Sequence, residues 1–530
     1  MDKELSRQLQ KGWDATCRVV MGKEIGQLED YTGWLSSQMQ MPSREKSGIT
    51  GKEVILASGL YPKTARFASA EEVVQNRSYA ISINDIKDLD TLLPALAERC
   101  EYSGNRFLGN TAFVDSSDLI TNSQYVARSA NVEKSSHVYL SWMIRKDSKY
   151  VFGSDWLAQG EFLIRVDGAH TLKRSLEAHY CVSSSDMHYC SSCIGCHDLM
   201  FSFGQRNKSH MIGNLALPKE KYAAIKAGLL GELAARLQKD KKLPALYSLV
   251  PNTTHAKRPA ITPANFPDEK KPGLVRKGFA KTYAIIFKRQ PRHEMEEYGG
   301  WLEEHTVTVE NVKTPFGCTT PCPTNWAYFG ELPRKRVVSI GELLELGKHP
   351  MREGNEKSLQ GVLGWVAENF FFTAEFYDGI NQNINETPCA YNAVNTYMGF
   401  DATSVENEAY SSCALNSKYV YGGTWILESE FCIKCYNSNF LTRCLEMDGC
   451  TKCADCYFCH NCEGLSDCMF CFNMKGARHC IGNTQLTREE YIKARDAILA
   501  KLADEMGRAR GLKMSIYNIG ASHGKRSDGK

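Results

Sequence analysis

Cysteines are the residues of this sequence best suited to chemistry, and they crowd one segment. The chain of 530 residues contains 21 of them, and most lie between residues 432 and 480 in two series with a nine-residue step. The first series is Cys435, Cys444, Cys453, Cys462, Cys471 and Cys480, and the second is Cys432, Cys450, Cys459 and Cys468, with Leu441 at the missing step. Cys-x-x-Cys pairs are typical of zinc sites, because one pair supplies two thiolates to a tetrahedral ion.

A second, sparser set of cysteines lies in the first half of the chain. Three of them match cysteines of the dense segment at a constant offset, namely Cys181 with Cys450, Cys190 with Cys459 and Cys193 with Cys462. The candidate metal ligands are therefore Cys450, Cys453, Cys456, Cys459, Cys462, Cys468 and Cys471, together with Cys181, Cys190, Cys193 and Cys196. Zinc is preferred over an iron–sulfur cluster, because closed all-thiolate tetrahedral sites suit zinc and no electron-transfer domain is recognisable.

The same spacing has a structural interpretation that involves no metal. The first half keeps the nine-residue frame but fills it with other residues, such as Leu163, Val166 and Ser175. Obligatory ligands would not tolerate those replacements, whereas a packed interior would, because cysteine is a small, readily buried residue. Zinc, an iron–sulfur cluster and a thiol-lined core without metal all remain open at this point.

The rest of the sequence shows no catalytic motif. It contains no phosphate-binding glycine-rich loop, no His-Glu-x-x-His and no nucleophile elbow. Cys318 and Cys322 form a lone pair whose zinc partners cannot be located, so we interpret them as loop cysteines. We therefore expect a protein that is not an enzyme.

The nine-residue period predicts the architecture that would position the cysteines. A short period repeated over many units indicates stacked coils, each burying its inner positions against the next. We expect two nine-residue units, about 18 residues, per coil, with equivalent side chains stacked at the ~4.8 Å spacing of strands. The predicted fold is α+β, with a short β-solenoid in each half.

An internal repeat links the two halves. Residues 147–153, Asp-Ser-Lys-Tyr-Val-Phe-Gly, return as residues 416–422, Asn-Ser-Lys-Tyr-Val-Tyr-Gly, at an offset of 269 that continues without a gap to Tyr222 and Tyr491. Weaker matches occur upstream, with Trp34 and Trp301 at offset 267 and Arg66 and Arg336 at offset 270. We interpret the chain as a tandem duplication of a unit of ~265 residues.

Helices and a linker complete the predicted organisation. Thr487 to Glu490 fits a capping box before an apolar helical pattern, and Pro218 is a helix-start residue at the matching position. Residues 8–21, 24–39, 342–346 and 359–369 are also expected to be helical. The predicted regions are an N-terminal helical region at 1–110, a solenoid with its capping helix at 111–238, a proline-rich linker at 239–275, a second N-terminal region at 276–387, a cysteine-rich solenoid with its helix at 388–510 and a polar tail at 511–530.

The bulk composition restricts the possible partners. A net charge of +3 gives no general electrostatic case for nucleic acid or membrane binding. The N-terminus lacks the apolar segment of a signal peptide and no run approaches a membrane span, so a cytoplasmic protein, or one assembled inside the cell, is expected. We expect a scaffold or structural subunit that binds protein partners in a larger assembly, with zinc as a staple. The alternative is an iron–sulfur or other metal-cluster protein with a redox or metal-handling role.

The last part of the cysteine-rich segment resembles a known pattern. Cys468-Met-Phe-Cys471, followed by Cys480-Ile-Gly-Asn483 and Glu489-Glu-Tyr491, is similar to the ending of uncharacterised cysteine-rich repeat proteins of candidate-phylum bacteria, archaea and mobile elements. The resemblance covers ~90 residues of the second half and implies a repeat architecture. Those relatives often carry N-terminal zinc-ribbon pairs, which this chain lacks.

Overall fold

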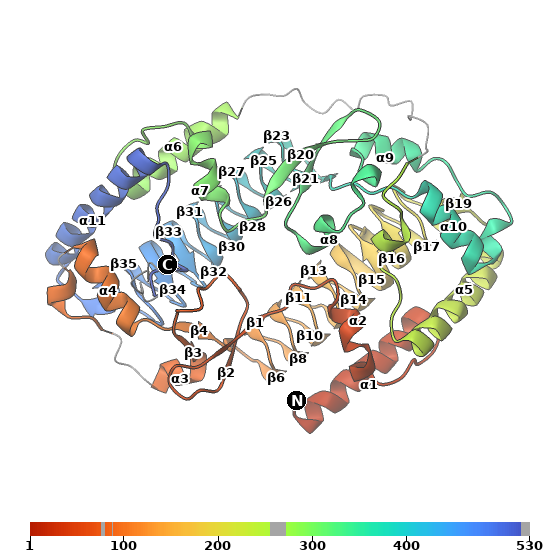
Figure 1. The fold of residues 1–530 in the computed structure, drawn as a ribbon, viewed down its shortest axis with the longest axis horizontal. Helices are drawn as coiled ribbons and strands as arrows, with labels where there is room; N and C mark the ends of the chain where they lie inside the picture. Colours follow the sequence, from red (N-terminus) through yellow and green to blue (C-terminus); the bar gives the residue numbers. More distant parts are fainter. Residues whose placement is uncertain (76–79, 87, 255–271, 521–530) are drawn as a thin grey trace, which may run out of the picture.

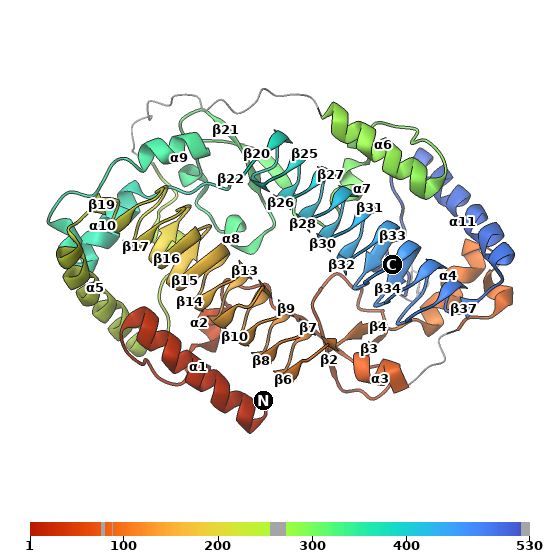
Figure 2. The same cartoon turned by 180° about the vertical axis from the view of Figure 1, so that it is seen from behind.

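The chain forms two long curved sheets of mainly parallel strands, surrounded by helices (Figures 1 and 2). This computed structural model describes residues 1–75, 80–86, 88–254 and 272–520. We refer to residues 1–254 as the first half and to residues 272–520 as the second half. The α+β class and the solenoid-like form of both sheets agree with the prediction from sequence.

Solenoid 1 is a sheet of 15 short strands in the first half, and solenoid 2 is a sheet of 16 strands in the second half. Solenoid 1 comprises β5 (Phe107–Leu108), β6 (Ala112–Asp115), β7 (Asp118–Thr121), β8 (Gln124–Ala127), β9 (Ala130–Glu133), β10 (Ser136–Tyr139), β11 (Trp142–Arg145), β12 (Lys149–Phe152), β13 (Asp155–Ala158), β14 (Glu161–Ile164), β15 (Asp167–His179), β16 (Val182–Ser191), β17 (His197–Met200), β18 (Ser209–Ile212) and β19 (Leu215–Ala216). Solenoid 2 comprises β22 (Phe376–Asp378), β23 (Gln382–Asn385), β24 (Cys389–Tyr391), β25 (Val394–Tyr397), β26 (Phe400–Thr403), β27 (Glu406–Ala409), β28 (Ser412–Leu415), β29 (Lys418–Tyr421), β30 (Thr424–Leu427), β31 (Glu430–Ile433), β32 (Tyr436–Asn439), β33 (Thr442–Asp448), β34 (Ala454–His460), β35 (Ser466–Met469), β36 (Arg478–Ile481) and β37 (Thr484–Gln485).

The strand register corrects the predicted size of a coil. Strands pair with residues twelve positions away, as Cys432 does with Cys444 and Cys456 with Cys468, so one coil holds about twelve residues and not the eighteen expected. Cysteines nine residues apart therefore lie on different sides of the coil, and the stacked neighbour of a cysteine is the residue twelve positions along.

A three-residue unit underlies this coil. In both solenoids nearly every third residue has a positive φ, for example Phe113, Ser116, Leu119 and Asn122, and the following residue faces the interior. Four such units close a coil of twelve residues. Non-glycine side chains rarely adopt this left-handed backbone, so the packed interior must offset its cost. The cysteines recur every nine residues because nine is a multiple of three. The interior positions between them hold other residues, such as Ser438, Leu441 and Met447, so the three-residue unit is not visible in the cysteine spacing.

Helices cover the flank and the end of each solenoid. The long helices are α1 (Lys3–Met21) and α5 (Lys219–Asp240) in the first half, and α6 (Gly273–Phe287) and α11 (Arg488–Ala509) in the second. Thr487 caps α11 through the predicted capping box, and Pro218 precedes α5 as expected. The predicted helix at 24–39 is instead a 3₁₀ turn (Leu28–Tyr31) followed by the short α2 (Thr32–Ser36).

The segments that follow the two end helices were expected to be part of a linker and of a polar tail. Instead, Leu243 and Leu246 are buried after α5, and Ile516 and Tyr517 are buried after α11. Each segment is short and has no regular apolar pattern, so the sequence does not reveal that it is anchored. The rest of the predicted linker (255–271) and tail (521–530) lies outside the described residues.

The remaining elements form two arms, which precede the solenoids in the chain. Arm 1 spans residues 43–104 and contains β1 (Ser43–Lys46), β2 (Glu53–Leu56), β3 (Phe67–Ser69), α3 (Ala70–Gln75), α4 (Leu89–Arg99) and β4 (Tyr102–Gly104). Arm 2 spans residues 309–372 and contains β20 (Val309–Lys313), β21 (Thr319–Pro323), α8 (Ala327–Gly330), α9 (Ile340–Leu346) and α10 (Leu359–Asn369). The short α7 (Gly299–Glu303) precedes arm 2. The helices predicted at 342–346 and 359–369 are therefore present as α9 and α10.

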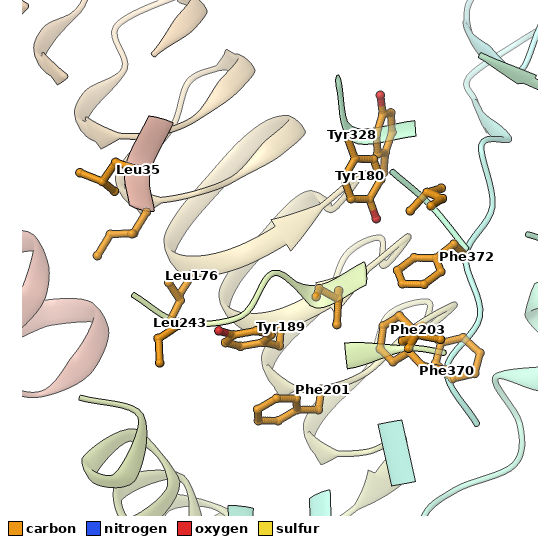
Figure 3. Close-up of a cluster of buried hydrophobic side chains, with 14 of the residues drawn as sticks. Leu35, Leu176, Tyr180, Tyr189, Phe201, Phe203, Leu243, Tyr328, Phe370 and Phe372 are labelled. Atoms are coloured by element: carbon orange, nitrogen blue, oxygen red, sulfur yellow. The ribbon is translucent and has the colours of Figure 1, made fainter. Parts of the chain in front are cut away.

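Each arm packs against the solenoid of the other half. Arm 1 and solenoid 2 share one hydrophobic core, and arm 2 and solenoid 1 share another. The ribbon shows α4 of arm 1 beside solenoid 2 and α10 of arm 2 beside solenoid 1 (Figures 1 and 2). In the close-up, Tyr328, Phe370 and Phe372 of arm 2 lie against Tyr180 and Phe203 of solenoid 1 (Figure 3).

The two exchanged contacts use corresponding hydrogen bonds. The amide of Ile81 in arm 1 donates to the carbonyl of Gly482 at 3.1 Å, and the amide of Met351 in arm 2 donates to the carbonyl of Gly213 at 2.9 Å. Both glycines have a positive φ, and a Cβ there would lie 2.2 Å from Ile81 Cδ1 or 2.5 Å from Met351 Cε. Only glycine allows the arm to approach so closely.

Candidate functional site

The structure places every predicted cysteine ligand inside a solenoid. Cys450, Cys453, Cys456, Cys459, Cys462, Cys468 and Cys471 belong to the core of solenoid 2, and Cys181, Cys190, Cys193 and Cys196 belong to the core of solenoid 1. Each is at most 2 % exposed. The residues matched between the halves are therefore brought into equivalent interiors, but solvent does not reach them.

The interior thiols bind the backbone. Cys459 Sγ lies 3.5 Å from the carbonyl oxygen of Tyr457, and Cys462 Sγ lies 3.3 Å from that of His460. A thiol must keep its proton to donate such bonds. Burial raises the pKa of Cys459 and Cys462 well above the usual range of a thiol, because it penalises the charged thiolate. Cys453 is different: hydrogen bonds from the thiols of Cys450 and Cys456 lower its pKa.

Serines occupy the same interior positions elsewhere in the solenoids. Ser438 Oγ donates to the carbonyl of Tyr436 at 2.6 Å and accepts the amide of Cys450 at 3.0 Å. Cys450 repeats the pattern one coil later, since its Sγ accepts the amide of Cys462 at 3.4 Å. The interior cysteines thus take the place of serines in a column of side chains that binds the backbone of neighbouring coils.

The geometry of the described residues does not form a metal site around the cysteines. Across residues 1–75, 80–86, 88–254 and 272–520, no group of three or more His, Cys, Asp or Glu side chains is arranged to hold a metal ion. The lone pair Cys318 and Cys322 lies at β21, and Cys322 is buried beside the guanidinium of Arg334 at 3.3 Å. The zinc spacing in the sequence is therefore accounted for by the three-residue unit.

A buried cation anchors each solenoid to the helices of its own half. Arg165 pairs with Glu177 and donates to the carbonyl of Trp34. In the second half, Lys434 lies 3.7 Å from Glu446 and donates to the carbonyl of Trp301 at 2.8 Å. Each glutamate also accepts a backbone amide of the segment after the end helix, from Leu246 in the first half and from Ile516 in the second.

A second polar cluster joins arm 1 to solenoid 2. Asp448 and His460 lie on one column of solenoid 2, with Nδ1 of His460 2.8 Å from the Asp448 carboxylate. Tyr61 of arm 1 donates to the same carboxylate at 2.6 Å, and the amide of Ser103 donates to Nε2 of His460 at 2.9 Å. Hydrogen bonds, led by the one from His460, and the nearby charge of Arg106 outweigh burial and lower the pKa of Asp448 to about 2. This cluster is internally satisfied and therefore structural.

The corresponding place between arm 2 and solenoid 1 is not satisfied. Asp155 and Asp167 are in register on β13 and β15, 4 % and 7 % exposed, and Asp155 Oδ1 and both Asp167 oxygens lack a hydrogen bond of good geometry. Burial raises the pKa of Asp167 to about 8, although hydrogen bonds from the amide of Gly168 and the indole of Trp326 lower it in part. Burial also raises the pKa of Asp155, and the neighbouring carboxyl group of Asp167 raises it further. Buried polar groups are almost always paired, so this junction is the strongest candidate site outside the cysteine cores.

A small, partly open cavity lies beside the two carboxyl groups. It has about 10 Å³ of accessible space and is lined by Gln38, Met39, Gly153, Asp155, Arg165, Val166, Asp167, His179 and Tyr328. The ring of Tyr328, from arm 2, stacks on His179 at 4.2 Å, and Tyr328 Oη, His179 Nδ1 and Gln38 Nε2 lack a hydrogen bond of good geometry. The space matches one water molecule or one small ion.

The prediction from sequence missed this junction, since it weighed only cysteines, histidines and catalytic motifs. Asp155 and Asp167 are twelve residues apart, and that spacing becomes informative only once the coil length is known. Tyr328 and Gln38 come from segments far away in the sequence, so no local pattern could place them there.

Comparison of the chain with protein-family models, curated proteins and solved structures gives no match. Among the described residues, none of the helices is both long and apolar enough to cross a membrane.

Proposed function

We propose that this protein is a non-enzymatic scaffold whose two solenoids are locked into one rigid platform for protein partners. The observation that carries the proposal is the exchange of arms, in which each half covers the solenoid of the other. Separating the solenoids would expose both shared cores. Solenoids commonly present extended surfaces to partners, and a fixed relation between two of them suits a structural subunit inside the cell.

We propose further that the halves arose by tandem duplication of one unit. Corresponding contacts support this idea, because a bidentate ion pair joins Arg174 to Asp186 in the first half and Arg443 to Asp455 in the second. The helices α4 and α10 also begin at Leu89 and Leu359, an offset of 270, close to the 269 that relates the solenoids. A single unit that assembled as an arm-exchanged dimer would give this arrangement after gene fusion.

The interior cysteines have a structural role in this proposal. Their burial and the backbone carbonyls beside their sulfur atoms favour a thiol core over a zinc staple or an iron–sulfur cluster. Metal analysis of protein purified without oxygen tests this part directly. Stoichiometric zinc or iron bound through the cysteines would overturn it and would favour the metal-cluster function instead.

The scaffold itself is tested by isolating the tagged protein from its native source after mild cross-linking. We expect companion proteins in fixed stoichiometry, cross-linked to the outer faces of the solenoids. Gly482→Val should displace arm 1 from solenoid 2 and reduce the yield of those companions, while Gly476→Val serves as the matched control. Gly476 has a similar positive φ, 60° against 56° at Gly482, but no neighbour within 4 Å of its Cβ position. A clean monomer without companions would refute the proposal.

A further inference from the structure

The cavity is lined by two buried carboxyl groups, Asp155 and Asp167, that no basic side chain of the described residues pairs with. The charged group that acts on Asp155 is Asp167, which has the same sign. Arg165 lines the cavity, but its guanidinium already pairs with Glu177. Two carboxyl groups taken from water without a counter-charge are strongly destabilising, so they must either keep protons or hold a cation.

Neutral oxygen atoms complete the surroundings of the cavity. Tyr328 is 4 % exposed, and its hydroxyl, which lies near the side chain of Ser191, lacks a hydrogen bond of good geometry. The amide of Gln38 is also without a partner at its nitrogen, and an amide side chain can turn to present its oxygen instead. The groups beside the cavity thus come from solenoid 1, from the segment after α2 and from arm 2.

We propose that this cavity binds one hard divalent cation. Carboxylate, amide and hydroxyl oxygens are the ligands of Ca²⁺ and Mg²⁺, whereas zinc prefers thiolates and imidazoles, and the only imidazole among the described residues of the lining, His179, is stacked on Tyr328. The site contains two acidic residues, so it differs from the groups of three acidic, histidine or cysteine ligands considered above. About 10 Å³ holds an ion without its water shell. Ca²⁺ is therefore favoured, because Mg²⁺ keeps several waters.

A cation here would fasten arm 2 to solenoid 1. In the contact between arm 1 and solenoid 2, the Asp448 carboxylate accepts hydrogen bonds from His460 and Tyr61 and lies near the charge of Arg106. The two exchanged contacts would then differ. The contact between arm 1 and solenoid 2 would be permanent, and the contact between arm 2 and solenoid 1 would depend on the concentration of the cation. This inference does not depend on the scaffold function, since a cation site could occur in a protein of any activity.

Terbium luminescence tests the site in the intact protein. Tb³⁺ replaces Ca²⁺ and is excited through nearby indoles, and the indole of Trp326 lies at Asp167. After chelation of bound metal, we expect saturable emission at one Tb³⁺ per chain that Ca²⁺ displaces. Native mass spectrometry of the same unmodified protein should show one bound Ca²⁺.

Two variants separate this site from other acidic groups. The double variant Asp155→Asn with Asp167→Asn should lose the emission and the rise in Tm that Ca²⁺ causes in the unmodified protein. Asp401→Asn, which changes another buried carboxyl group outside this cavity, should keep both. Emission that persists in the double variant, or an unmodified protein that binds no Ca²⁺ by mass spectrometry, would overturn the proposal. The second result would mean that the pair keeps a proton and a water molecule instead.

Discussion

Replacing Cys450 by serine tests whether the interior cysteines are packing residues. Cys450 is 1 % exposed, and its sulfur donates toward the carbonyl of Asp448 at 3.5 Å while accepting the amide of Cys462 at 3.4 Å. Ser438 makes the same two bonds one coil earlier, at 2.6 and 3.0 Å. A serine at position 450 should therefore fit the column without rearrangement.

The expected change in stability is small because two effects oppose each other. The hydroxyl forms stronger hydrogen bonds than the thiol, a gain of about 1 kcal/mol. Burying oxygen in place of sulfur loses apolar transfer free energy of similar size, about 1 kcal/mol. Cys450→Ser should thus change the free energy of unfolding by less than about 1 kcal/mol. Cys450→Ala leaves the amide of Cys462 without an acceptor and should cost about 1–3 kcal/mol.

Urea unfolding followed by circular dichroism, with metal content measured on the same samples, provides the comparison. The unmodified protein and Cys450→Ser should have nearly equal midpoints, and Cys450→Ala should unfold at lower urea. If Cys450→Ser were instead more damaging than Cys450→Ala and released stoichiometric metal, Cys450 would be a ligand. The assignment of the cysteines to the core would then be wrong.

Three further predictions follow from the buried carboxyl groups and the arms. In the presence of a chelator, the free energy of unfolding should fall as pH rises from about 4 to about 8. The reason is that folded Asp167, whose pKa is about 8, keeps a proton that the unfolded chain has released. The Asp167→Asn variant should show a smaller decline in its urea midpoint over the same pH range. Glu408→Val should raise the free energy of unfolding at pH 7.5 by about 1–3 kcal/mol, because both carboxyl oxygens of Glu408 lack partners inside solenoid 2, where the residue lies next to Val420. An unchanged or lower urea midpoint would contradict this prediction. Fragments 1–254 and 272–520 should form a 1:1 complex in analytical ultracentrifugation, and two independent monomers would argue against the exchange of arms.

Some of the fold could be predicted because its signals are local. The capping box at Thr487 and the apolar pattern after it define α11 within a single turn of chain, and the pattern at 359–369 likewise defines α10. The repeated cysteines indicate stacked coils, since a recurring side chain in a short period needs a recurring environment. The length of a coil was mispredicted, because the sequence records which residues are interior but not how many units close one turn.

Long-range packing decided the rest. Only the folded chain brings Tyr61 to Asp448 and Tyr328 to His179, because the arms cross to the solenoid of the other half. The sequence by itself determined that small side chains recur in two solenoids and that helices end them. The tertiary structure decided that the repeated cysteines face inward beside backbone carbonyls, since the strand register sets which positions are interior. It also decided that Asp155 and Asp167, twelve residues apart, lie buried together beside one cavity.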